Sequence, residues 1–188
     1  MTGAGDVLYR LNGRDEIEFV NDAWGDFAAA NGGVRLAAAD VLGRPLWDFI
    51  ADSTTRELYR SVLARIQGGR SVRFTFRCDS PACRRLLEMS VTSGPGGGGA
   101  EFRTRTLSEE SRPRQPLLTS DALQSDELVR VCGWCKKVNV GGAWVEVEEA
   151  VSRLRLFERP LLPKVTHGIC TDCLATVKRA LTQAQRTA

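Results

Sequence analysis

The stretch IEFVNDAWGDFAAANGG, residues 17–33, contains the transition that decides how the N-terminal part of the chain folds. Its first four residues are mostly apolar and predict a strand. Asn21 follows directly, and an Asn in this place favours the N-terminal cap of a helix that carries Trp24, Phe27 and Ala28. The Asn-Gly-Gly at the end predicts that this helix stops there. A strand that passes directly into a helix indicates a mixed α+β fold.

Upstream of this stretch, the segment Val7–Leu11 also predicts a strand. Asn12-Gly13 lies between the two apolar segments and is a strong signal for a tight hairpin. Downstream, Thr54 and Glu57 form a capping-box pattern before a helix that Gly68-Gly69 ends. The first two strands should therefore form a hairpin, with helices following them.

Three further strands are predicted after the helices. Residues 72–78 alternate apolar and polar side chains with a period of two, as a strand with one buried face does. Residues 86–93 and 101–107 repeat the alternation, and a glycine-rich loop joins them. The N-terminal part should therefore contain a five-stranded antiparallel sheet, with its helices inserted between the second and third strands.

The composition is that of a globular protein. The chain has 188 residues, of which 43% are hydrophobic and 26% are charged. No apolar run is long enough to span a membrane, and the N-terminus lacks the pattern of a secretory signal, so we expect a cytoplasmic protein. The formal net charge of +3 is too small to predict nucleic-acid binding from charge alone.

A polar, proline-bearing segment around Pro113 and Pro116 predicts a division of the chain into two domains. We expect a first domain at 1–110, a linker at 111–127 and a second domain at 128–188 that ends in a helix. The second domain is too small to bury a large core.

The N-terminal domain resembles PAS domains over residues 5–110. The segments Ile17–Trp24 and Val41–Ile50, the long helix and the three strands carry this resemblance. It implies a curved five-stranded sheet with helices over one face. In the family, the pocket between the sheet and the helices binds a small ligand or is filled by side chains. The sequence does not identify a ligand. The resemblance also implies dimerisation and signalling to an attached element.

Two CxxC pairs are the strongest signal for a site. Six cysteines in a reducing compartment favour metal ligands or redox groups over a disulfide framework. Two tight turns with four thiolates can surround one ion as a tetrahedron, which suits Zn(II) better than an iron–sulfur cluster. Unrelated buried thiols or a catalytic dithiol are weaker alternatives. The predicted ligands are Cys132, Cys135, Cys170 and Cys173.

The same region resembles a cysteine-rich element that follows PAS domains in bacterial signalling proteins. In that element a CxWCK segment precedes a Trp, and HGxCxxC closes the module, as CGWCKKV, Trp144 and HGICTDC do here. A turn for the first pair and a helix start for the second predict a treble-clef-like zinc domain. His167 is the only histidine, and we weigh it as an alternative ligand or as a residue that orients a ligand turn.

A polar turn with two more cysteines, RCDSPACRR, lies between two predicted strands. The arginines around Cys78 and Cys83 could lower the pKa of a thiol, which makes a redox pair conceivable, but a buried strand residue and an incidental thiol are the simpler interpretation. We expect this turn to contact another subunit or the zinc module. The candidate contact residues are Arg77, Asp79, Arg84 and Arg85.

No catalytic constellation is evident in the sequence. No phosphate-cradling GxxxxGK[ST] loop is present, and one histidine cannot supply both a metal neighbour and a catalytic triad. No histidine lies in the PAS-like part, which argues against histidine-ligated haem there. We therefore expect a non-enzymatic signalling protein that forms a homodimer and binds a protein partner. A zinc-dependent nucleic-acid-binding regulator and a thiol redox sensor are the alternatives.

Overall fold

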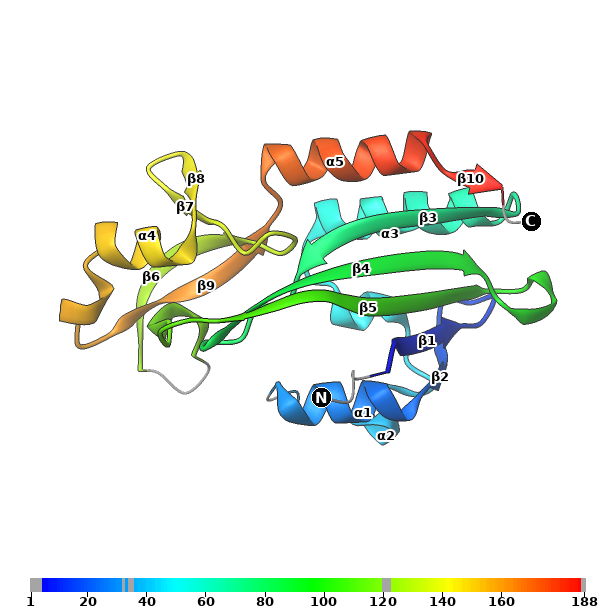
Figure 1. Ribbon diagram of the computed structural model, residues 1–188, viewed down its shortest axis with the longest axis horizontal. Helices are drawn as coiled ribbons and strands as arrows, with labels where there is room; N and C mark the ends of the chain where they lie inside the picture. The colour runs from blue at the N-terminus through cyan, green and yellow to red at the C-terminus, as the bar shows by residue number, and fades with distance from the viewer. Residues whose placement is uncertain (1–4, 32, 34–35, 120–122, 187–188) are drawn as a thin grey trace. The chain divides into compact units, whose positions relative to one another are not determined.

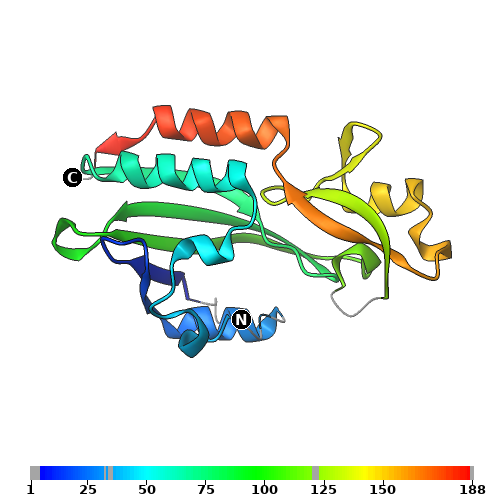
Figure 2. The ribbon, with the colours of Figure 1, turned by 180° about the vertical axis from the view of Figure 1, so that it is seen from behind.

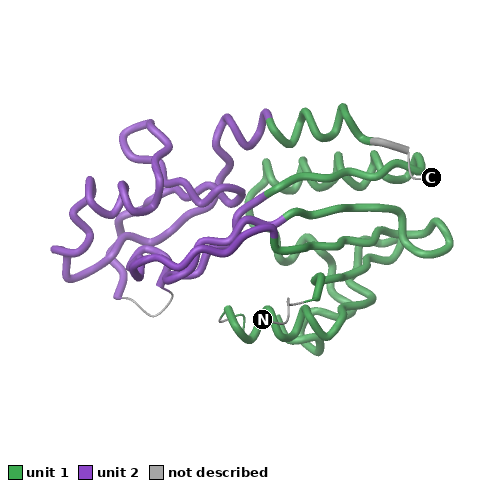
Figure 3. Tube along the Cα trace, in the orientation of Figure 1, with its two compact units in different colours: residues 1–75, 88–106, 176–188 green, residues 76–87, 107–175 purple. Residues whose placement is uncertain are grey.

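The computed structural model describes residues 5–31, 33, 36–119 and 123–186. The chain divides into two compact units, coloured separately in Figure 3. The first unit contains residues 1–75, 88–106 and 176–188, and the second contains residues 76–87 and 107–175. Each unit is therefore built from segments that are separated in the sequence.

The first unit is organised around an antiparallel sheet (Figure 1). The strand order is β10-β3-β4-β5-β1-β2. The bounds are β1 Val7–Leu11, β2 Ile17–Val20, β3 Arg70–Arg77, β4 Cys83–Ser93, β5 Ala100–Ser111 and β10 Gln185–Arg186. The five predicted antiparallel strands are confirmed. The short sixth strand, β10, pairs with the outer edge of β3 and was not predicted from the sequence.

The helices predicted between β2 and β3 are present in the first unit. They are α1 Asp22–Ala30, α2 Ala38–Val41, the 3₁₀ helix η2 Leu46–Phe49 and α3 Ser53–Ile66. Asn21 caps α1, since its side chain accepts a hydrogen bond from the Trp24 amide at 3.1 Å. The cap of α3 is Asp52, which accepts from the Thr55 amide at 2.7 Å. The capping box predicted at Thr54 and Glu57 is wrong by two residues, because Asp52 and not Thr54 provides the cap.

Aromatic side chains fill the centre of the first unit. Phe102 is fully buried, and its ring stacks on Tyr9 with 4.5 Å between the centroids. Tyr59 of α3 stacks on the other side of the same cluster, 6.1 Å from Phe102. In Figure 2, α3 (cyan) lies above β4 and β5 (green). Burial raises the pKa of Tyr59 to about 12, so its hydroxyl stays protonated at neutral pH.

The glycine-rich loop between β4 and β5 requires glycine at one position. Gly99 has a φ of +63°, and a Cβ built there would lie 1.9 Å from the Leu11 carbonyl oxygen. The backbone of the loop thus passes directly against the end of β1. A side chain at this position would separate β5 from β1.

The second unit contains a smaller four-stranded sheet in the order β8-β7-β6-β9. Its strands are β6 Gln124–Cys132, β7 Val138–Val140, β8 Ala143–Val145 and β9 Leu162–Gly168, and its helices are α4 Val147–Arg153 and the first part of α5 Thr171–Thr182. β6 and β9 run parallel, whereas the other pairs are antiparallel. Valines dominate the core, and Val138 and Val147 are fully buried in it.

The predicted linker at 111–127 is largely structured. β5 continues to Ser111, a 3₁₀ helix, η4, covers Pro116–Leu118, and β6 begins at Gln124. Leu117 is buried in the core of the second unit. The division found in the structure therefore differs from the predicted 1–110, 111–127 and 128–188. Short-range composition identified a polar segment, but a few apolar residues within it anchor the segment to a core.

No helix in the described part of the chain is long and apolar enough to cross a membrane.

Candidate metal centre

Four cysteine sulfurs lie together in the second unit. The Sγ atoms of Cys132, Cys135, Cys170 and Cys173 are all within 4.8 Å of one another. Cys135 Sγ and Cys170 Sγ are 3.7 Å apart. A tetrahedral ion with metal–sulfur bonds of about 2.3 Å separates its ligand sulfurs by about 3.8 Å. The spacing of these thiols therefore fits one tetrahedral metal ion.

The first pair lies in a tight turn at the end of β6. The Cys132 amide donates to the Lys137 carbonyl at 2.8 Å, and the Lys136 amide donates to the Cys132 carbonyl at 3.0 Å. Lys136 has a φ of +62°, a left-handed conformation that closes the turn. The Gly133 amide donates to the Gly168 carbonyl at 2.8 Å, which ties this turn to the end of β9.

The second pair lies where β9 passes into α5. Cys170 directly precedes the helix, and Cys173 is in its first turn. The Cys170 amide points at Cys132 Sγ at 3.4 Å, and the Cys173 amide points at Cys170 Sγ at 3.4 Å. Amide donors and the positive end of a helix both favour thiolate over thiol. The backbone is therefore arranged to stabilise negative sulfur.

The neighbouring thiols strongly shift one another's pKa values. Hydrogen bonds from Cys135 and Cys173 lower the pKa of Cys132, with help from backbone amides. The interaction with Cys132 raises the pKa of Cys135 to about 12, and Cys132 and Cys135 also raise the pKa of Cys173. Four adjacent thiolates therefore need a cation to be stable together, and a divalent metal ion supplies one.

His167 lies on β9, opposite Val131 of β6. The cluster of ligand atoms in the described residues consists of the four cysteines and does not include His167. Its side chain lines a cavity of about 290 Å³ together with Lys136 and Asp79. A role for His167 in orienting the ligand turns stays a prediction.

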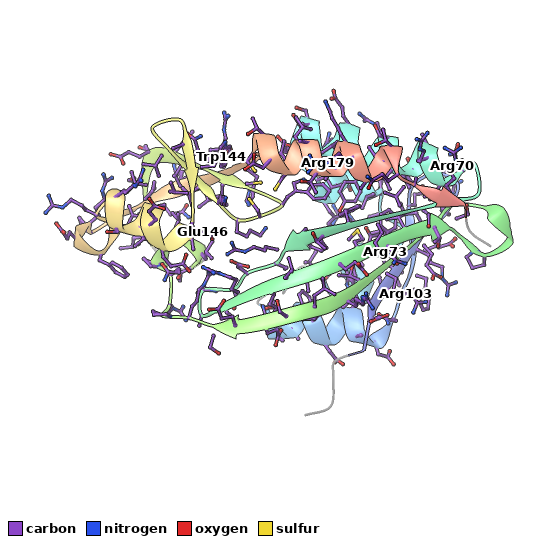
Figure 4. The ribbon with its side chains drawn as sticks, turned by 45° about the horizontal axis from the view of Figure 1, so that its top comes forward. Arg70, Arg73, Arg103, Trp144, Glu146 and Arg179 are labelled. Carbon is purple, nitrogen blue, oxygen red and sulfur yellow. The ribbon has the colours of Figure 1, made fainter. Side chains whose placement is uncertain are left out.

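The RCDSPACRR turn belongs to the second unit. The Arg77 amide donates to the carbonyl of Trp134, inside the first CxxC turn, at 2.6 Å. The Arg77 guanidinium pairs with Asp79, whose side chain is fully buried, and with Glu146 at 2.6 Å. Figure 4 labels Glu146, which directly precedes α4. Burial opposes the charge of Arg77, but its two carboxylate partners raise its pKa above the usual value.

The two following arginines also have acidic partners. Arg84 pairs with Glu148 of α4 at 3.0 Å, and Arg85 pairs with Glu109 at 2.6 Å. These four candidate contact residues thus make ion pairs within the second unit. Whether they also contact a separate protein stays a prediction.

The sequence did not reveal one central member of this ion-pair network. Arg112 is 5% exposed and pairs with Asp79 at 3.1 Å and with Glu148 at 3.0 Å. It lies in the segment predicted to be a linker, where no sequence pattern indicates that an arginine is buried. These ion pairs centre on the buried side chains of Asp79 and Arg112, with the half-exposed Glu146 and Glu148 at the edge. We define the buried ion network as Arg77, Asp79, Arg84, Arg112, Glu146 and Glu148.

Cys78 and Cys83 are half-buried and lie outside the four-sulfur cluster. Burial raises the pKa of Cys78, although Lys136 and Arg85 act in the opposite direction. The suggested lowering of the pKa by neighbouring arginines is therefore wrong for Cys78, because desolvation outweighs their charge.

Comparison with protein-family models and with curated proteins finds no match. Among solved structures, the chain is similar to the Aer2 receptor from Vibrio cholerae, described as a dual PAS-heme oxygen sensor. The identity is 16%, the match covers 55% of this chain and 95% of that chain, and the TM-score is 0.36. Because the identity and the TM-score are both low, we infer nothing about ligand or activity from this likeness.

Proposed function

We propose that the second unit is a zinc-stabilised module and that the chain acts as a non-enzymatic regulatory protein. The clustering of four cysteine sulfurs within 4.8 Å carries this proposal. Four thiolates complete the tetrahedral coordination of Zn(II) and leave no position for water or substrate. An ion held in this way stabilises a fold and does not activate a reactant.

A treble-clef-like arrangement is part of this proposal. Its support is the placement of Cys132 and Cys135 in a turn after β6, and of Cys170 and Cys173 at the start of α5. Zn(II) would join the end of the small sheet to the helix. The ion thereby replaces apolar contacts that a unit of this size cannot make.

For the first unit we propose a PAS-type sensor or docking role. The resemblance of residues 5–110 to PAS sequences and the five-stranded sheet with helices between β2 and β3 support it. We do not propose histidine-ligated haem, because His167 is the only histidine of the sequence and belongs to the second unit. The aromatic rings around Phe102 occupy the centre of this unit, which favours a core filled by side chains.

The proposed output is a contact with a protein partner. The second unit exposes large apolar side chains, among them Leu128 at 71% and Phe157 at 73%. A contiguous exposed apolar patch is typical of a surface that binds another protein, and we propose that these side chains belong to one. A homodimer through the first unit is a further proposal. An open sheet face and the apolar residues Val7 and Leu8 suggest it. Leu8 is only 8% exposed and Val7 is half-buried, so the sheet face would have to supply most of the contact.

Elemental analysis of protein purified without chelator tests the metal assignment. We expect one zinc per chain and no visible absorbance. Iron together with visible absorbance would instead indicate an iron site. The absence of any metal would contradict the proposal. Titration with a thiol-blocking reagent should release the zinc in step with modification of four thiols, while Cys78 and Cys83 react independently of metal release.

A further inference from the structure

A cavity on the first unit lies outside the metal centre. Its volume is about 430 Å³, and β3, β4 and the C-terminal half of α5 line it. Two contacts tie the end of α5 and the strand after it to α3 and to the sheet of this unit. Arg65 Nε donates to the Leu181 carbonyl at 2.8 Å, and β10 pairs with β3. The walls of the cavity are thus parts of one compact unit.

The cavity has both polar and apolar walls: Phe74 and two alanines border it, and its polar residues on β3 follow the strand period. Val72 and Phe74 of β3 are buried in the core. The alternate residues Ser71, Arg73 and Thr75 project from the opposite face of β3 and line the cavity. Hydroxyl donors therefore stand on either side of an arginine along one strand.

Arg73 and Arg179 give the cavity its positive charge. Figure 4 labels Arg73 on the sheet and Arg179 on α5, the two walls. The Arg73 side chain is 67% exposed and lies 3.9 Å from Glu88, a long distance for an ion pair. The Glu88 carboxylate lies much closer to Arg105, at 2.9 Å. The acid of the cavity is thus engaged mainly by a neighbouring arginine, and Arg73 retains donors for a ligand.

The positive region continues beyond the cavity. A smaller hollow of about 180 Å³ shares Arg73 and Glu88 and is also lined by Arg103 and Arg105. On the α5 side, Arg179 donates to the Thr176 hydroxyl at 2.9 Å, which orients its guanidinium beside a further hydroxyl. Arginines outnumber acids over both hollows.

We propose that this cavity binds a small phosphate monoester of about mononucleotide size. Guanidinium groups bind phosphate oxygens through paired, charge-assisted hydrogen bonds, and hydroxyl groups complete such sites. A volume of about 430 Å³ falls in the range of small-ligand pockets, about 300–1,000 Å³. Binding here does not depend on the metal or on the proposed role of the second unit.

Isothermal titration calorimetry of the full chain with AMP, ribose 5-phosphate and adenosine tests this proposal. We expect the two phosphates to bind and adenosine to give no heat. Arg73→Gln and Arg179→Gln should each weaken binding about tenfold, because each removes a charged donor. Arg73→Lys and Arg179→Lys, which retain the charge, should recover part of that loss.

Arg14→Gln is the matched control, since Arg14 is an exposed arginine of the same unit in a turn that does not line the cavity. It should leave binding unchanged. Equal weakening by Arg14→Gln would show attraction by overall charge and overturn the proposal. So would equal affinity for adenosine and AMP, or the absence of heat with both phosphates at millimolar concentration. All variants should melt like the parent protein, because these side chains are exposed.

Discussion

The two units of the molecule are stabilised by different means. The first unit buries large side chains, and its centre is a stack of the aromatic rings of Tyr9, Phe102 and Tyr59. The second unit buries mainly valines and combines them with a cluster of four thiols and the buried ion network. A small unit has too little apolar surface to bury, so polar cross-links supply what its core lacks. The second unit should therefore respond to metal and pH, and the first to changes of core volume.

Loss of a metal ligand should produce the largest difference between the units. Cys135→Ser leaves three thiolates and should abolish zinc binding and unfold the second unit, because structural zinc contributes about 10–16 kcal/mol in small zinc domains. Hydrogen exchange should show loss of protection at Val129 and Val131, with protection retained at Phe102. Cys83→Ser is the control and should retain one zinc per chain. A Cys135→Ser protein that keeps both zinc and protection at Val131 would contradict the idea that the second unit depends on metal.

The reverse test alters the core of the first unit. Phe102→Ala removes a fully buried ring and should destabilise the first unit by about 3–5 kcal/mol. Its zinc content should stay at one per chain. Phe157→Ala, at a side chain that is 73% exposed, should change stability by less than about 0.5 kcal/mol. Thermal unfolding followed by tyrosine fluorescence and by zinc release measures the two units separately. If Phe102→Ala releases its zinc at the same lowered melting temperature at which the first unit unfolds, the two units unfold together.

The buried ion network should matter only to the second unit. Asp79→Asn leaves Arg77 and Arg112 without their shared carboxylate, and removing one partner of a buried pair costs about 3–5 kcal/mol. Asp126→Asn removes a carboxylate that is fully exposed and pairs with Lys164, so its effect should be below about 1 kcal/mol. Urea titration of zinc-loaded protein compares the two variants. Equal midpoints for both would mean that the network does not stabilise the unit.

The smallest expected effect is a pH dependence at Glu148. Burial would raise its pKa, but a backbone hydrogen bond and the charges of Arg112 and Arg84 outweigh burial and lower the pKa from 4.5. The pKa is thus lower in the folded state than in the unfolded chain. The stabilisation is complete above about pH 4.5 and is lost as the pH falls through the lowered value. The gap between the melting temperatures of the parent protein and Glu148→Gln should therefore narrow below about pH 4.5. A difference in melting temperature that does not change with pH would mean that packing, and not ionisation of Glu148, causes the effect.

Sequence periodicity predicted the first unit well because its elements are local. The hairpin at Asn12-Gly13, the cap at Asn21 and the alternation from Val72 onward each depend on neighbouring residues, and all are present in the structure. The sequence missed β10, since a strand of two residues shows no period. It exists because α5 returns the chain to the edge of β3.

The cysteine cluster was predictable for a similar reason, since each CxxC pair is a local turn and four thiols suit one ion. The ion network was not predictable. Arg112 and Asp79 are 33 positions apart in the sequence, and Arg112 lies in a polar segment that resembles a linker. Tertiary packing decides which arginine pairs with which acidic residue. No periodicity or spacing in the sequence indicates these pairs.

The discontinuous composition of both units has a consequence for biosynthesis. The first unit needs residues 176–186, so it cannot be completed until this segment has left the ribosome. The second unit needs residues 76–87, which are synthesised well before its remaining segments. The charged turn of Arg77 and Asp79 must therefore stay solvated until the segment around Glu146 and the metal-binding cysteines emerge. A truncated chain that ends near residue 127 would lack segments of both units, although the sequence suggests a clean boundary there. The last segment of the first unit is synthesised directly after the last segment of the second, so the two units should be completed in close succession.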